Sequence, residues 1–115
     1  MTWWDQIVEF NDEYFPDWRE NRDLIFFSNA LAGEVGEICN LVKKAYRGGT
    51  NSKKVLLEDL AIEAIDVFIY LVLYCEALGI NEQAFTNWFE KKMKINEERM
   101  ESRRSLPSRK GELKC

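Results

Sequence analysis

A long apolar run broken by two acids constrains the fold of this chain most strongly. Residues 60–75 read Leu-Ala-Ile-Glu-Ala-Ile-Asp-Val-Phe-Ile-Tyr-Leu-Val-Leu-Tyr-Cys, which is apolar on nearly every side of a helical wheel. A helix of this kind is normally enclosed by neighbouring elements. Within it, Glu63, Asp66 and Tyr70 are three and four residues apart and form one stripe. Two carboxylates in such a setting repel each other and lose hydration, so the pattern predicts a neutralising partner.

A second acidic pair with the same spacing lies earlier in the chain. Glu34 and Glu37 fall within residues 30–39, Ala-Leu-Ala-Gly-Glu-Val-Gly-Glu-Ile-Cys, at the edge of an apolar stripe. Gly33 and Gly36 each cost about 1 kcal/mol of helix propensity relative to alanine, which indicates close approach of another helix or a ligand. A single Glu-x-x-Glu is usually a solvated surface pair. Two pairs on consecutive helices that can pack antiparallel favour a shared cation site instead.

The remaining sequence is also helical in pattern, with no strand alternation and no internal repeat. A chain of 115 residues is long enough for one domain with a modest core. We therefore predict an all-α, four-helix bundle-like domain over residues 1–102, followed by a basic, flexible tail over residues 103–115. The expected helices run from Thr2 to about Tyr14, from Ser28 or Asn29 to Gly48-Gly49, from Ser52 to Leu78 before a C-terminal Gly79, and from Asn81 as N-cap to about Glu101.

The charge distribution bears on possible partners. The net charge is −4, but residues 1–100 carry eleven basic and eighteen acidic side chains, while residues 101–115 carry five basic and two acidic ones. Binding of a nucleic acid polymer draws on clustered Lys and Arg, so the acidic body argues against that partner. The chain starts without a signal-peptide pattern, and acids interrupt its apolar stretches before membrane-spanning length. We therefore expect a cytoplasmic protein with no membrane partner.

The residue types that are missing narrow the choice of metal. The chain has no histidine, and its three cysteines lack a Cys-x-x-Cys spacing, so the usual ligands of zinc and of a Glu/His di-iron site are not available. Carboxylates with no softer donor favour Mg²⁺, with Mn²⁺ as a substitute. Mg²⁺ held by a few carboxylates also binds substrate phosphates. Cys39 and Cys75 lie in apolar helical patterns and are expected to be buried free thiols.

The residue types also limit the reactions that this chain could catalyse. The sequence contains no Gly-x-x-x-x-Gly-Lys-Ser/Thr phosphate-binding loop, and without histidine it cannot form a Ser-His or Cys-His nucleophile. Attack of water on a metal-bound phosphoryl group, with a carboxylate as general base, is the chemistry that these residues favour.

Glu34-Val35-Gly36-Glu37 and Glu63-Ala64-Ile65-Asp66 together resemble the paired motif of the all-α nucleoside triphosphate pyrophosphohydrolase superfamily, which includes MazG-like and dCTP pyrophosphatase-like members. The resemblance covers roughly residues 3–100. It implies a MazG-type fold assembled as a homodimer or homotetramer. It also implies Mg²⁺-dependent conversion of a (d)NTP to the (d)NMP and pyrophosphate, as house-cleaning of the nucleotide pool on a deoxynucleotide such as dCTP.

The resemblance further implies roles for individual residues. Glu34, Glu37, Glu63 and Asp66 would bind Mg²⁺ and carry catalysis, and Tyr70 would lie near the substrate. The segment Lys92-Met93-x-Ile95-Asn96-x-x-Arg99 would place Lys92, Asn96 and Arg99 against the substrate. Lys44 stands where some relatives carry a tryptophan, which bears on base preference, and as part of a basic loop it is a candidate for steering phosphates. Trp18 and Trp4 are candidates for stacking on a base, although aromatic residues at helical spacing more often form a core or an interface.

Two alternatives stay open from the sequence. One is a helical interaction module without catalysis, whose acids pair with Lys and Arg of a partner. The other is a phosphoribosyl-ATP pyrophosphatase-like activity within the same superfamily. Dependence on a divalent metal separates the first alternative from an enzyme, and a panel of nucleotides assayed for released pyrophosphate separates the second.

Overall fold

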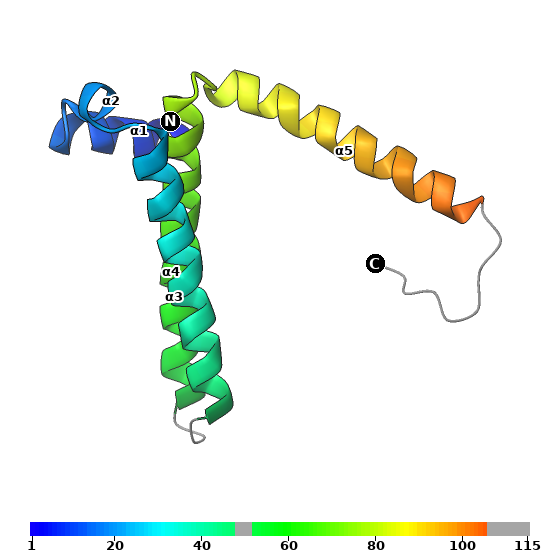
Figure 1. The fold of residues 1–115 in the computed structure, drawn as a ribbon, viewed down its shortest axis with the longest axis horizontal. Helices are drawn as coiled ribbons and strands as arrows, with labels where there is room; N and C mark the ends of the chain where they lie inside the picture. The colour runs from blue at the N-terminus through cyan, green and yellow to red at the C-terminus, as the bar shows by residue number, and fades with distance from the viewer. Residues whose placement is uncertain (48–51, 106–115) are drawn as a thin grey trace. The chain divides into compact units, whose positions relative to one another are not determined.

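The computed structural model describes residues 1–47 and 52–105, with side chains described in these ranges except for residues 52–56. This part of the chain is entirely helical, which confirms the predicted all-α class. The chain divides into two compact units, residues 1–81 and the residues from Glu82 onward, and each is described by itself. The five helices are α1 (Trp3–Tyr14), α2 (Trp18–Asn21), α3 (Leu24–Arg47), α4 (Ser52–Ala77) and α5 (Glu82–Arg104) (Figure 1).

A capping box formed by Thr2 and Asp5 fixes the start of α1. The Thr2 hydroxyl accepts a hydrogen bond from the Asp5 backbone N–H at 3.1 Å, and the Asp5 carboxylate accepts one from the Thr2 backbone N–H at 3.4 Å. These two bonds satisfy backbone donors that a helix start otherwise leaves unpaired. The inward face of α1 carries the buried residues Trp4 and Asn11, with the half-buried Ile7 between them.

The start of α3 lies earlier than the predicted Ser28 or Asn29. The Asp23 carboxylate accepts a hydrogen bond from the backbone N–H of Phe26 at 2.9 Å, which is an N-cap interaction. The helix therefore begins at Leu24, and the residues before it include the short helix α2, where the sequence predicted no helix.

The end of α4 is set by Gly79, as predicted. Gly79 has φ of +84°, a left-handed conformation that glycine adopts at little cost. Its N–H donates to the Glu76 carbonyl at 2.9 Å, and the Ile80 N–H donates to the Cys75 carbonyl at 2.8 Å. This pair of bonds is a Schellman motif, which satisfies the last carbonyls of the helix and turns the chain out of α4.

The last helix, α5, begins after Asn81 as predicted and continues past the predicted end at Glu101 to Arg104. The first two residues of the predicted tail are therefore helical, and Ser105 lies in a turn. Residues 106–115, which make up most of that tail, lie outside the described residues.

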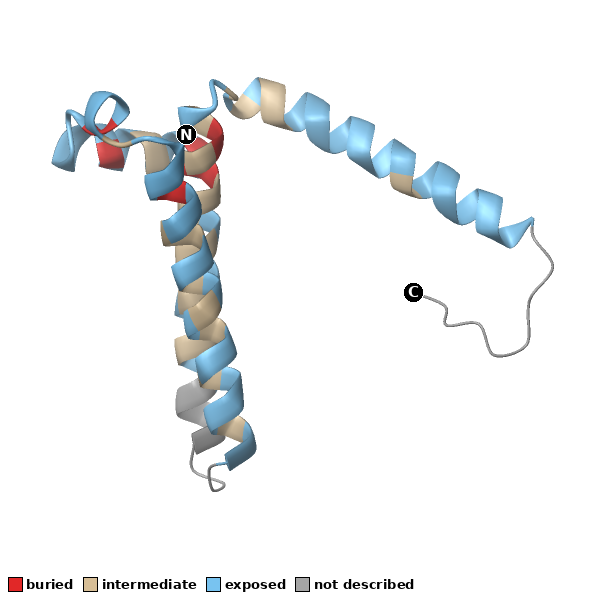
Figure 2. Cartoon of the chain, viewed as in Figure 1, coloured by how far each residue is buried: buried red, intermediate tan, exposed pale blue. Residues whose placement is uncertain are grey.

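Within the first unit, α3 and α4 run antiparallel and side by side, and α1 packs against the C-terminal half of α4 (Figure 1). The buried residues gather at the end of the α3–α4 pair where α1 packs (Figure 2). The centre of the core is formed by Trp18, Phe27 and Leu73. The rings of Trp18 and Phe27 meet edge to face, with centroids 5.6 Å apart.

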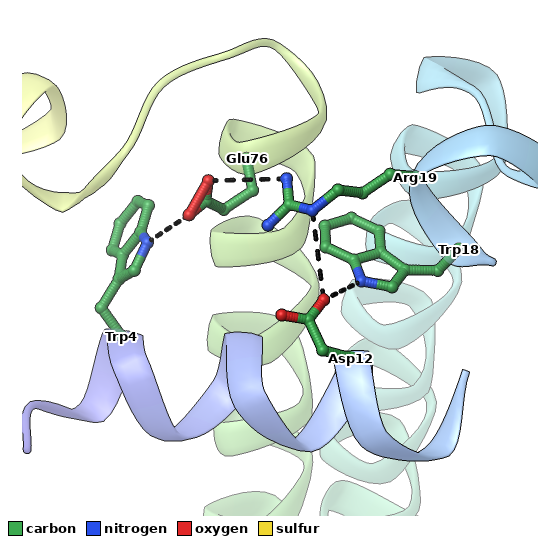
Figure 3. Close-up of polar contacts among 5 residues, drawn as sticks. All are labelled: Trp4, Asp12, Trp18, Arg19 and Glu76. Carbon is green, nitrogen blue, oxygen red and sulfur yellow. Dashed lines mark hydrogen bonds and ion pairs between the residues drawn. The ribbon is translucent and has the colours of Figure 1, made fainter. Parts of the chain in front are cut away.

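A polar network joins α1, α2 and α4 next to this core (Figure 3). The Trp4 indole N–H donates to Glu76 at 3.1 Å, and Glu76 pairs with Arg19 at 3.9 Å. Arg19 also lies 4.0 Å from Asp12, which accepts the Trp18 indole N–H at 2.7 Å. Because both indole N–H groups are bonded within the fold, Trp4 and Trp18 act here as anchors of the N-terminal helices.

Two burial expectations are wrong for the described chain. The middle of α4 is not enclosed, since Ile62 and Ile65 are 61% and 59% exposed. The reason is that α3 covers only one side of this stretch, while α1 packs nearer the end of the helix. Cys39 is exposed, whereas Cys75 is buried as predicted, and burial raises the pKa of the Cys75 thiol. Among the described helices, none is long and apolar enough to cross a membrane.

Candidate metal centre

Three of the four predicted metal ligands converge between α3 and α4. Glu34 on α3 and Glu63 and Asp66 on α4 each offer a carboxylate oxygen, and these oxygens lie within 4.8 Å of one another. The three-residue spacing places Glu63 and Asp66 on one side of α4, and the antiparallel packing brings Glu34 opposite them. All three residues are half-buried. We call this group the carboxylate cluster.

The carboxylate cluster fits a hard divalent cation. The Oε2 atom of Glu63 is buried and has no hydrogen-bond partner among the described residues. No lysine or arginine whose side chain is described forms an ion pair with any of the three acids. A buried acceptor without a partner costs about 1–3 kcal/mol, and more when it is charged. An all-oxygen ligand set with an unsatisfied buried oxygen is the kind of site that Mg²⁺ or Mn²⁺ would occupy.

The electrostatics of the carboxylate cluster lead to the same conclusion. A side-chain hydrogen bond with Glu63, burial, and the charges of Glu63, Asp66 and Glu37 raise the pKa of Glu34 from its ordinary value of 4.5 to about 7. Near neutral pH Glu34 is therefore partly protonated, which reduces the repulsion within the cluster. A cation bound here would displace this proton, because carboxylate ligands bind metals in their deprotonated form.

The raised pKa of Glu34 makes the stability of the metal-free protein depend on pH. Between 4.5 and about 7 the folded protein holds a proton that the unfolded chain has lost. The stabilising contribution is therefore complete below the unfolded pKa and is lost as pH rises through the folded pKa. With chelator present, we expect the Tm of the wild type to fall relative to that of Glu34→Gln as pH rises from about 5 to about 8. A Tm difference between the two proteins that stays constant over this range would contradict the raised pKa of Glu34.

Glu37, the fourth predicted ligand, is exposed and does not belong to the carboxylate cluster. Its charge nevertheless contributes to the raised pKa of Glu34. The neighbouring glycines also differ from expectation, since a Cβ built at Gly33 or Gly36 meets no heavy atom within 4 Å. The described part of the chain thus makes no close approach at these glycines.

A cavity of about 470 Å³ adjoins the carboxylate cluster at Asp66. Its volume falls within the range of small-molecule sites, about 300–1,000 Å³. We call it the α1–α4 cavity, because α1 supplies Asn11, the start of α3 supplies Phe26 and α4 supplies Asp66 and Tyr70. Tyr70, which was predicted to lie near the substrate, therefore lines the same space as one of the three clustered acids.

Two polar residues of the α1–α4 cavity are not among the site residues predicted from the sequence: Asn11 and Arg22. Asn11 lies seven residues after Trp4 on the inward face of α1, where an apolar residue is usual. A polar residue at an expected core position was therefore the sequence feature that could have indicated a binding role for Asn11. Arg22 follows α2 and gave no comparable pattern.

The other predicted substrate residues have different surroundings. Trp18 is buried in the core with its indole N–H bonded to Asp12, so the core interpretation holds and the stacking role does not.

Lys44 is exposed, about three turns or 15 Å along α3 from Glu34. Lys92 and Arg99 are exposed and Asn96 is half-buried on α5, at spacings that share a helix face. Because α5 belongs to the second unit, their roles stay predictions.

Comparisons of this chain with family models, curated proteins and solved structures find no significant match. The resemblance to the pyrophosphohydrolase superfamily therefore rests on the two acidic motifs and their sequence context. The functional interpretation depends on the geometry and chemistry of the carboxylate cluster and the cavity beside it.

Proposed function

We propose that this chain is a Mg²⁺-dependent nucleoside triphosphate pyrophosphohydrolase. It would convert a (d)NTP to the (d)NMP and pyrophosphate, with a common or modified deoxynucleotide such as dCTP as substrate. One observation carries the proposal: Glu34, Glu63 and Asp66 converge from two helices around a buried carboxylate oxygen that lacks a partner among the described residues. A cluster of carboxylates alone, with no ion pair to a described basic side chain, suits a metal that binds phosphate oxygens.

The positions of these residues lead us to assign each of them a separate role. Glu34, Glu63 and Asp66 would hold Mg²⁺, which when bound polarises phosphoryl oxygens and offsets negative charge on the substrate. With those three acids engaged, Glu37 is the nearby carboxylate left to accept a proton from the attacking water. Tyr70 would contact the substrate from the cavity wall.

The protein would act as a homodimer or homotetramer. Ile62, Ile65 and Phe68 leave large apolar surfaces exposed on α4 in the single chain, beside the carboxylate cluster. Burial of apolar surface stabilises association by about 25 cal/mol per Å² before the cost of association. The open space at Gly33 and Gly36 leaves room for a second copy to approach α3 closely. Light scattering coupled to size-exclusion chromatography measures the assembly directly.

The alternatives predict different behaviour. In a non-catalytic helical interaction module, the exposed apolar residues of α4 would meet another protein and the acids would pair with its Lys or Arg. Such a module gains no thermal stability from Mg²⁺. A phosphoribosyl-ATP pyrophosphatase-like enzyme would share the metal dependence and differ only in its substrate.

The test is a pyrophosphate-release screen over common and modified ribo- and deoxyribonucleoside triphosphates and phosphoribosyl-ATP. Each reaction is run with Mg²⁺, with Mn²⁺ and with excess chelator. We expect metal-dependent release of pyrophosphate from at least one (d)NTP. Release from phosphoribosyl-ATP alone would favour the rival enzyme, and no release from any nucleotide would overturn the proposed activity.

A further inference from the structure

Asn11 is a buried polar residue whose side-chain amide donor is unpaired among the described residues. It is 5% exposed, and its Nδ2 atom has no hydrogen-bond partner among the described residues. Only its backbone has a clear structural role, since the carbonyl accepts the Phe15 N–H at 2.8 Å. Keeping an amide donor buried and unpaired destabilises a protein, and an apolar residue of similar size would remove that cost. Such a group calls for an explanation other than packing.

The surroundings of Asn11 indicate what would pair with it. Asn11 lines the α1–α4 cavity together with Phe15, Arg22 and Phe26. The Arg22 guanidinium lies over both aromatic rings, 4.5 Å from the Phe15 centroid and 4.7 Å from the Phe26 centroid. No carboxylate of the described residues pairs with Arg22. The cavity thus combines flat apolar surfaces with the Asn11 amide donor and the Arg22 guanidinium, neither of which has an acceptor or ion-pair partner among the described residues.

The position of the cavity relates this chemistry to the carboxylate cluster. Asp66 belongs both to the cluster and to the cavity wall. A ligand with its aromatic part in the cavity would therefore have a neighbouring group within reach of the clustered acids. A flat aromatic ring with acceptor atoms on its edge, joined to a phosphoryl chain, is a nucleotide.

We propose that the α1–α4 cavity holds the nucleobase of the substrate and that Asn11 determines base specificity by donating a hydrogen bond from Nδ2 to an acceptor atom on the base edge. This inference rests on the proposed function for the identity of the phosphoryl chain. It adds a residue that selects among nucleotides without touching the reacting phosphorus.

The kinetic test compares the wild type with Asn11→Leu. For the preferred triphosphate, we expect kcat/KM to fall about tenfold, mainly through KM, because one base-edge hydrogen bond is lost. The Tm should stay equal or rise, since an unpaired buried donor is removed. Inorganic tripolyphosphate, which has the phosphoryl chain without a base, should inhibit both proteins equally. The matched control is Asn40→Leu at an exposed position of α3, with no change expected in KM.

Asn11→Asp gives a second reading if Asn11→Leu does not fold. It keeps the shape of the side chain and replaces the donor with an acceptor, so the order of preference among bases should change. Values of kcat/KM within about twofold of wild type for every nucleotide in both variants would overturn the assignment. A lower Tm with unchanged kinetic constants would do the same, by giving Asn11 a structural role only.

A binding titration separates this inference from the proposed activity. Nucleoside monophosphates of the four common bases are titrated into metal-free protein by calorimetry. Suppose that no triphosphate releases pyrophosphate, but that a monophosphate binds the wild type and binds Asn11→Leu about tenfold more weakly. The proposed activity is then wrong, while the proposed base site is supported. If pyrophosphate is released but no monophosphate binding depends on Asn11, the activity stands and the base site fails.

Discussion

Replacing Glu63 with glutamine is expected to abolish pyrophosphate release and, at the same time, to raise the thermal stability of the metal-free protein. The buried Oε2 of Glu63 has no partner within the described chain, so we expect this carboxylate to serve a bound cation rather than the fold. Loss of a metal ligand should lower kcat/KM by at least about 100-fold, since even outer-shell changes cost 10–100-fold. Without metal, the substitution removes the carboxyl group whose hydrogen bond and charge raise the pKa of Glu34, so one source of like-charge repulsion is lost. Asp66→Asn should behave in the same way.

The two measurements are steady-state release of pyrophosphate with Mg²⁺ and calorimetric unfolding with chelator. Glu58→Gln is the matched control, because Glu58 is an exposed acid on the same helix outside the cluster. It should leave both quantities near wild type. Activity retained in Glu63→Gln, or a lower Tm in its metal-free form, would show that this acid serves the fold instead.

Lys92→Ala is expected to lower kcat/KM for the triphosphate about 10–100-fold, with little change in Tm. The side chain is exposed on α5, so its removal should change the free energy of unfolding very little. A charge-assisted hydrogen bond to a phosphate is worth about 1.5–3 kcal/mol, which corresponds to that range. The effect should grow at low ionic strength, because screening weakens interactions between exposed charges.

Lys94→Ala separates a specific contact from a general effect of charge. Lys94 is also exposed on α5, and two residues of separation place it on a different side of the helix from Lys92. Removal of either lysine changes the net charge of the chain by the same amount. Equal losses in both variants would mean that Lys92 contributes only to the overall electrostatic potential.

Local signals account for the parts of the fold that the sequence predicted. The Thr2–Asp5 capping box and the left-handed Gly79 depend on residues within one turn of each other, so the sequence contains the whole interaction. The apolar periodicity likewise required helices throughout. The pairing of Glu63 with Asp66 needed only the geometry of a single helix.

Other features depend on how helices pack, which spacing alone does not determine. Glu34 and Glu37 have equivalent positions in the sequence pattern, yet only Glu34 joins the carboxylate cluster. The rotation of α3 about its own axis, relative to α4, determines which of the two glutamates faces Glu63 and Asp66. Trp18 was ambiguous for the same reason, because its burial depends on Phe27 from the following helix. Asn11 joined the candidate site only once α1 was placed beside α4.

Titration calorimetry of Mg²⁺ into the metal-free protein at neutral pH, beside the Asp66→Asn variant, tests the carboxylate cluster most directly. We expect saturable binding to the wild type with release of protons, because bound Mg²⁺ would displace the proton of Glu34, whose pKa is raised to about 7. We also expect Asp66→Asn to lose this binding. Absence of saturable binding, or binding that the variant preserves in full, would contradict a metal centre at Glu34, Glu63 and Asp66.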